Sequence, residues 1–347
     1  MPISNVIVQP GKGFHALTDS FKDEAKLAGS VQVLAGLRKV LNLAIKHAGE
    51  RRAFGDYLSS YESVQNKLGR ASILLFALES TIYMTAGLAD YQAEPDTCLE
   101  ATATRLMASQ TARYIGDVCK RILGSSTFLS DNEAVAILDD IEGLQWWESL
   151  EDMNNLYLGL GGLSYSAENR QEKVTNLRNP YDDLFSTFRH VRKLKSGVNS
   201  WTKEPKLRWK LHEDVHPSLV VAAKKVEVMC LYLDYVTDGL FVQHGANIQL
   251  AEIDVERLAE MATLIYAMIS TLARANRSYC DGHSHADLEV KLCNTYVLLM
   301  EGPFMQLCGD AMLPDLQKVD PFVRDISQYM SSQGLYANVH PVTKNMF

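Results

Sequence analysis

Two stretches of the sequence place residue types where they could do chemistry. The first contains Glu148, which follows Trp146 and Trp147. Apolar surroundings raise the pKa of a carboxyl group, and a raised pKa suits a general base that works near neutral pH. The alternative is an exposed acid near the start of a helix, where the helix dipole favours a negative charge. Both interpretations stay open at this point, and Glu148 is our candidate base.

The second stretch covers residues 51–55, Arg-Arg-Ala-Phe-Gly, at the end of a long helical pattern. A guanidinium group such as that of Arg51 can bind phosphate through two parallel hydrogen bonds. The simpler interpretation is that a basic residue complements the negative end of the helix dipole. The residue types therefore permit anion binding here without requiring it.

A third group contains metal-binding residue types, namely His283, His285 and Asp287. These residues lie in a glycine-containing loop, and no distant ligand of matching spacing accompanies them, so we do not expect a metal site. The sequence also contains no Walker-type loop or nucleophile elbow, which argues against an NTPase and against a serine hydrolase of that type.

Composition sets further limits. A chain of 347 residues, 47% of them apolar, is long enough for two helical domains. No run of about eighteen apolar residues occurs, so we expect no membrane span. The net charge of −8 argues against nucleic-acid binding. Six cysteines without C-x-x-C spacing predict reduced core thiols, which suits an intracellular protein.

Apolar residues recur at three and four positions over most of the chain, which predicts an all-α protein. Antiparallel helices with short links form a bundle, and a second group of helices follows it. We expect a break in the first part before Gly29, where the charged pattern changes. The expected helices cover 14–26, 31–54, 63–91 and 98–123 in the first group, and 219–241, 248–276, 288–307 and 323–336 in the second.

Four segments are predicted from these patterns. They are a short strand at 6–8 with its turn (1–13), a helical bundle (14–163), a basic amphipathic linker (164–214) and a second helical domain (215–347). The composition changes after the glycine-rich run 159–162. Within the linker, residues 185–210 combine basic and aromatic side chains, which could contact an anionic membrane surface or an acidic partner. A solvated loop across the bundle is the alternative.

The motif at 51–55, followed by Gln65, resembles the arginine-to-phenylalanine-glycine motif and the following glutamine of the acyl-CoA dehydrogenase family. The resemblance continues over nearly the whole chain and looks like the very-long-chain branch, including its member that serves mitochondrial complex I assembly. It is carried further by residues 79–87, 95–101, 215–219, 272–278 and 292–295.

This resemblance implies a particular architecture and cofactor. It implies the family's C-terminal four-helix bundle followed by a second helical domain, with the N-terminal strand as the end of a β domain. It also implies a homodimer in which Arg51, Phe54 and Gln65 help to hold FAD at the subunit interface. By register, Gly124 starts a loop that in the family lies close to the adenosine part of the flavin.

The sequence departs from the family pattern at this loop. Arg121 stands in place of a glutamine, and Ser125 and Thr127 stand in place of two glycines. Glycine allows a backbone to approach a phosphate or a ring closely, whereas a Cβ and a hydroxyl remove that freedom. These replacements argue against flavin binding.

The candidate base also has altered neighbours. Glu148 aligns with the glutamate that, in the resembling enzymes, removes the α-proton of an acyl-CoA thioester while FAD accepts the β-hydride. Ser149 and Leu150 replace a glycine and a threonine of the family motif, and Asn155 replaces a downstream arginine. A general base without a positioned electron acceptor performs no dehydrogenation, so the retained glutamate indicates activity only weakly.

Two main functions follow from the resemblance, and a third possibility is a pseudoenzyme that binds FAD for stability without chemistry. The first is a scaffold for the assembly of mitochondrial respiratory complex I, on the matrix side of the inner membrane, with assembly factors as partners and peripheral membrane contact through 185–210. The second is the C-terminal part of an FAD-dependent long- or very-long-chain acyl-CoA dehydrogenase of fatty-acid β-oxidation. The altered loop at Gly124 and the altered surroundings of Glu148 favour the scaffold.

Overall fold

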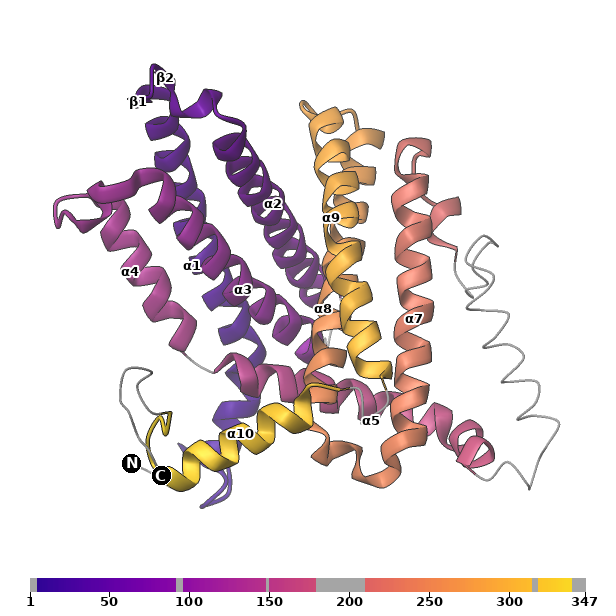
Figure 1. Ribbon diagram of the computed structural model, residues 1–347. Helices are drawn as coiled ribbons and strands as arrows, with labels where there is room; N and C mark the ends of the chain where they lie inside the picture. Colours follow the sequence, from indigo (N-terminus) through magenta and orange to yellow (C-terminus); the bar gives the residue numbers. More distant parts are fainter. Residues whose placement is uncertain (1–4, 92–95, 148–149, 179–209, 314–317, 339–347) are drawn as a thin grey trace.

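Helices make up almost all of the protein in the computed structural model, which describes residues 5–91, 96–147, 150–178, 210–313 and 318–338 (Figure 1). The predicted all-α class is confirmed. The helices are α1 (Gly13–Glu50), α2 (Glu62–Tyr91), α3 (Cys98–Leu123), α4 (Glu133–Trp146), α5 (Glu151–Arg178), α7 (Val220–His244), α8 (Glu252–Cys280), α9 (Ala286–Met312) and α10 (Asp320–Gln333). Two short strands, β1 (Arg52–Ala53) and β2 (Asp56–Tyr57), form an antiparallel hairpin after α1.

The first bundle forms because α1, α2 and α3 each have an apolar face that must be buried. Leu37 of α1, Leu78 of α2 and Ile115 of α3 are fully buried in its core. Burying a side chain of this size stabilises the fold by about 1.5–3 kcal/mol. Helix α4 covers α1 and α3, and it begins where the Asn132 side chain accepts a hydrogen bond of 3.0 Å from the backbone N–H of Ala134.

The second bundle contains α7, α8 and α9, and it shares its core with the first. Figure 1 shows α1–α4 on one side, α7–α9 on the other and α5 passing below both. Buried residues of the two bundles, such as Met107 of α3, Met261 of α8 and Phe304 of α9, belong to one continuous apolar cluster. Helix α8 is central, since it packs against α2, α3, α5, α7 and α9.

Helix α5 is the largest departure from the sequence-based prediction, because it runs unbroken from the expected bundle into the expected linker. Two of its three glycines, Gly159 and Gly161, are packing positions. A Cβ on Gly159 would lie 2.6 Å from the backbone oxygen of Val255 in α8, and a Cβ on Gly161 would lie 2.7 Å from the side chain of Leu99 in α3. The division of the chain into domains stays a prediction.

The expected break before Gly29 is also wrong, because α1 is continuous over 38 residues. Gly29 lies inside the helix, where a Cβ would come within 3.3 Å of the guanidinium of Arg105. The glycine therefore makes room for a neighbouring side chain. Helix α1 ends at Glu50, before the expected residue 54, because Arg51 already has an extended backbone (φ −76°, ψ 125°) and leads into the hairpin.

The predicted strand at residues 6–8 does not form. Val6 and Ile7 are 58% and 97% exposed, and no strand lies beside them in the described part of the chain. A strand without a partner leaves its backbone groups to water and gains little stability. The local β preference of the residues is therefore not enough to form a strand.

By length and composition, α2 and α8 could each cross a membrane. Their apolar stretches are 44% and 61% buried inside the protein, and core helices of bundles pass the same test. All six cysteines are free. Cys119, Cys293 and Cys308 are buried, Cys98 and Cys230 are partly buried and Cys280 is exposed, so the expectation of core thiols holds for some of them only.

Helix α10 has no buried residue and is held at its start by ion pairs. Arg257 of α8 donates two hydrogen bonds of 2.9 Å to Asp320 and one of 2.8 Å to Asp254. The Nζ of Lys318 lies 3.0 Å from Asp254. These charges fix the beginning of α10 while its remaining turns stay at the surface.

We predict that Gly159→Ala destabilises the protein by about 1–3 kcal/mol, because the new methyl group would press on the backbone of α8. The matched control is Gly162→Ala on the same helix, where no atom lies within 4 Å of the added Cβ. This control should be neutral or gain up to about 1 kcal/mol from helix propensity. Urea unfolding measures both, and equal stability of the two variants would contradict the packing role of Gly159.

We also predict a pH-dependent effect of Asp320→Asn. The Arg257 guanidinium lowers the pKa of Asp320 below its ordinary value, so this carboxylate contributes stability that is present above that value and is lost as the pH falls through the lowered pKa. The variant should be less stable than the wild type by roughly 1 kcal/mol near pH 7, and the difference should vanish near pH 2. The control is Asp325→Asn on the exposed face of α10, which should show no such trend in thermal unfolding.

Candidate functional site

The hairpin that follows α1 holds the first group of predicted site residues. Its two-residue turn consists of Phe54 and Gly55, both with positive φ. A bulky residue rarely adopts this conformation, and tight hairpins usually place asparagine or aspartate before the glycine. The Phe54 side chain is also fully exposed. The backbone of Phe54 is therefore strained, and none of the described residues covers its side chain.

Arg51 and Gln65 lie beside this hairpin. The Arg51 side chain is exposed and has no ion-pair partner among the described residues, while its backbone N–H donates to the carbonyl of His47 (2.8 Å). The Gln65 amide nitrogen donates to the carbonyl of Ser59 at 2.9 Å, within the short 3-10 helix η2 (Leu58–Ser60). Arg51 is available for an anion, whereas the Gln65 amide stabilises a turn.

The loop after α3 begins at Gly124, which ends that helix with φ 65°. It forms a 3-10 helix, η3 (Gly124–Phe128), in which the Thr127 hydroxyl donates to the Gly124 carbonyl at 2.7 Å. The Ser126 hydroxyl donates to the Leu123 carbonyl at 2.8 Å. The loop therefore satisfies its own carbonyls. Arg121, which replaces the family's glutamine, pairs with Asp117 at 2.8 Å.

The structure brings these residues to one end of the first bundle. Helices α1 and α3 end there, and α2 and α4 begin there (Figure 1). Two cavities in the described part of the chain, one beside Met107 and one beside Gly162, do not include Arg51, Phe54, Gln65 or Gly124. The loop hydroxyls and the Gln65 amide are engaged in local hydrogen bonds, so among these positions the exposed Arg51 side chain is the one open to an anion.

Glu148 lies outside the described residues, but the segments on both sides of it are placed. Arg105 of α3 is fully buried and donates hydrogen bonds to the carbonyls of Leu144 and Trp147, the latter at 3.1 Å. On the other side, Arg113 of α3 pairs with Glu151, the first residue of α5, with one hydrogen bond of 2.7 Å. Two arginines of one helix therefore hold the ends of the segment that carries the candidate base.

Sequence reasoning missed Arg105. Its signal was a charged residue on the apolar side of the α3 pattern, beside Leu106 and Thr102. Buried charges are costly unless they are hydrogen-bonded, so such a residue marks a place where the chain needs a fixed donor. Here the donors hold the C-terminal end of α4.

A second polar group lies one turn away, between α1, α3 and α5. Lys26 is buried, donates to the Thr102 hydroxyl at 2.8 Å and lies 4.5 Å from the centre of the Tyr157 ring. The Tyr157 hydroxyl contacts the thiol of Cys98. Burial raises the pKa of Cys98, and the hydrogen bond with Cys98 raises the pKa of Tyr157. The thiol therefore stays protonated at neutral pH and is no activated nucleophile.

The two predicted groups are well separated. Gly124 lies before the start of α4 and Glu148 follows its end. A 14-residue helix spans about 21 Å, so the two ends of α4 lie well apart.

Two further predictions concern the histidine-containing loop and the basic segment 185–210. No group of three metal-binding side chains occurs among the residues that the structure describes, which includes His283 and His285. Residues 185–209 lie outside the described part, so the predicted membrane or partner segment stays a prediction. Its last residue, Lys210, pairs with Glu213 at 2.6 Å.

Comparisons with known proteins identify the class of this region. Residues 11–153 match the model of the acyl-CoA dehydrogenase C-terminal domain, and residues 217–306 match the model of the ACAD9/ACADV C-terminal domain. The chain therefore contains an acyl-CoA dehydrogenase-like C-terminal region, as the motif at 51–55 predicted.

Its curated relatives include very long-chain specific acyl-CoA dehydrogenases of mitochondria. The human protein is 27% identical over 307 residues, which cover 86% of this chain and 45% of the relative, and the bovine protein is 26% identical over the same shares. This chain thus spans about half the length of the curated relatives it matches.

Solved structures share the fold. An acyl-CoA dehydrogenase from Bacillus anthracis, complexed with FAD, superposes with a TM-score of 0.68 at 13% identity, over 92% of this chain and 53% of the other. ACDH-11 of Caenorhabditis elegans, in complex with C11-CoA, gives a TM-score of 0.55 at 15% identity, over 78% of this chain and 42% of the other. At these identities the likeness shows the fold alone.

We predict that Arg105→Met costs about 2 kcal/mol, because methionine fills a similar volume but removes charged donors from two carbonyls. Amide exchange should also become faster at Trp147 and Glu151. The control is Arg121→Met, on the exposed face of α3, which should cost less than about 0.5 kcal/mol. A wild-type unfolding curve for Arg105→Met would show that this arginine does not hold the segment.

Proposed function

We propose that this chain is the C-terminal region of an acyl-CoA dehydrogenase-like protein of mitochondria that acts as a scaffold in the assembly of respiratory complex I. The observation that supports this proposal is that side chains at positions matching the family's flavin site are engaged in contacts within the protein. Gln65 holds a turn, Arg121 is paired with Asp117, and the loop from Gly124 to Phe128 uses its own hydroxyls to satisfy its own carbonyls. Side chains that are engaged in hydrogen bonds and ion pairs within the protein stabilise the fold without holding a cofactor.

The relatives support a mitochondrial location, and the resemblance is the reason for proposing the partners. The relatives' names place those proteins in mitochondria. In this proposal the protein forms a homodimer through its first bundle and works on the matrix side of the inner membrane. It contacts the membrane peripherally through 185–210 and holds complex I assembly factors with the linker and the second bundle.

A second candidate function is the C-terminal part of an FAD-dependent long- or very-long-chain acyl-CoA dehydrogenase. The observation in its favour is the exposed end of the first bundle, where Arg51 is unpaired among the described residues and Phe54 is strained and uncovered. Strained exposed residues are frequent at functional sites. In that function Glu148 would act as the base on the acyl-CoA thioester.

The two functions differ in flavin retention. We expect the full-length protein, incubated with FAD and then desalted, to show no flavin absorption and to reduce no electron acceptor with palmitoyl-CoA. Retained flavin together with turnover, abolished in Glu148→Gln, would establish the enzyme and overturn the scaffold. If the protein is a scaffold, it should co-migrate with complex I assembly intermediates from mitochondrial membranes. Assembly intermediates that lack the protein would contradict this function.

A further inference from the structure

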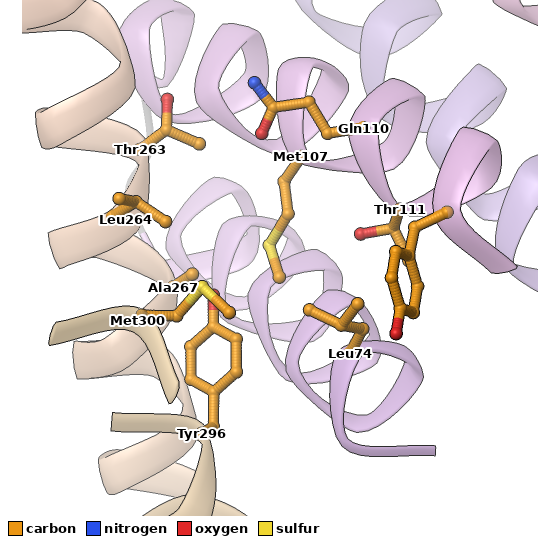
Figure 2. A pocket seen from close by; sticks show the side chains of 10 residues that line it. Leu74, Met107, Gln110, Thr111, Thr263, Leu264, Ala267, Tyr296 and Met300 are labelled. Atoms are coloured by element: carbon orange, nitrogen blue, oxygen red, sulfur yellow. The ribbon is translucent and has the colours of Figure 1, made fainter. Parts of the chain in front are cut away.

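A small cavity lies where the two bundles meet. Its volume is about 140 Å³, and its walls come from α2 and α3 on one side and from α8 and α9 on the other. Figure 2 shows the side chains of Leu74, Met107, Tyr296 and Met300 converging on this space. The cavity therefore belongs to neither bundle alone.

The lining is apolar and adaptable. Met107 is 5% exposed, and Ala267 and Tyr296 are 1% exposed, so the inner walls are closed to solvent. Methionine side chains adjust their shape easily and make favourable contacts with aromatic rings. Two of them face the space, Met107 from α3 and Met300 from α9.

Size and chemistry indicate what such a space can hold. An engineered apolar cavity of about 150 Å³ in another protein stays free of water and binds benzene or xenon. The present cavity is of that size. Gln110 and Thr111 of α3 also line it and add an amide and a hydroxyl at one side, and Tyr114, which is 36% exposed, marks its open edge. One polar substituent on a ligand could be accommodated there.

The walls are fixed by charges on the same helices. Glu79 of α2 accepts a hydrogen bond of 2.9 Å from Arg274 of α8, and Arg274 also donates to Glu289 of α9 at 2.9 Å. Arg38 of α1 pairs with the same Glu79. Of these contacts, the Arg274–Glu79 pair crosses between the bundles and holds α8 against α2.

We propose that this cavity is a binding site for a small apolar group of about six carbon atoms, a ring or the end of an aliphatic chain, with at most one polar substituent. Because both bundles supply the walls, the occupant contacts both and strengthens their association. The residues that line it do not include Arg51, Phe54, Gln65 or Gly124.

The test uses benzene and phenol as probes of protein labelled with ¹³C at the methionine methyl groups. The methyl signals of Met107 and Met300 should shift in a saturable way, with benzene raising the unfolding temperature as it binds. Ala267→Leu fills the cavity and should abolish the shifts at both methyl groups. Ala273→Leu, on the exposed face of the same helix, is the control and should keep them.

Three results would overturn the site. They are no shift at Met107 and Met300, a shift that rises linearly at all methionines without saturation, or unchanged binding in Ala267→Leu. If that variant does not fold, Leu74→Ala replaces it, because it enlarges the cavity. This variant must bind naphthalene at least tenfold more tightly than the wild type does, and equal affinity would also overturn the site.

Discussion

The close packing of α5 against the rest of the molecule is the constraint on which the two bundles depend. Helix α5 crosses beneath both bundles and touches α3, α7 and α8. It can do so only because Gly159 lets its backbone meet the backbone of Val255. Interiors are packed as densely as organic crystals, so one missing Cβ decides whether two helices meet. The shared apolar core and the charge pairs of Arg274 then complete the junction.

Buried charge has a positioning role in this fold. Arg105 is fully buried, yet it donates to carbonyls at the end of α4, and Gly29 makes room for it in α1. An unsatisfied helix end inside a protein is costly, and a guanidinium group offers several donors in a fixed plane. Helix α3 therefore holds Trp147, the last described residue before Glu148, and Glu151, the first residue of α5.

Much of the fold could be predicted from the sequence because helix periodicity is local. The bounds of α3 agree with the prediction, and those of α2 differ by one residue. Glycines misled the prediction at Gly29, and Gly159 and Gly161 stand where the composition changes, yet all three serve contacts with residues far along the chain. The candidate site was only partly predictable for the same reason. Motif spacing found Arg51 and Gln65, whereas the role of Arg105 depends on partners that lie about forty residues away.

The two turns at the end of the first bundle differ in how well their local contacts explain their conformation. The loop after Gly124 places its hydroxyls on its own carbonyls, and only its glycine has positive φ. The turn after α1 places Phe54 at a positive φ and leaves the whole ring in solvent. An asparagine at that position would form the same turn at a lower cost. A strained conformation persists where the surrounding structure holds the residue in it. The described contacts around Phe54 do not hold it in this way. The fold of this region alone therefore does not explain why residue 54 is a phenylalanine or why it has this conformation.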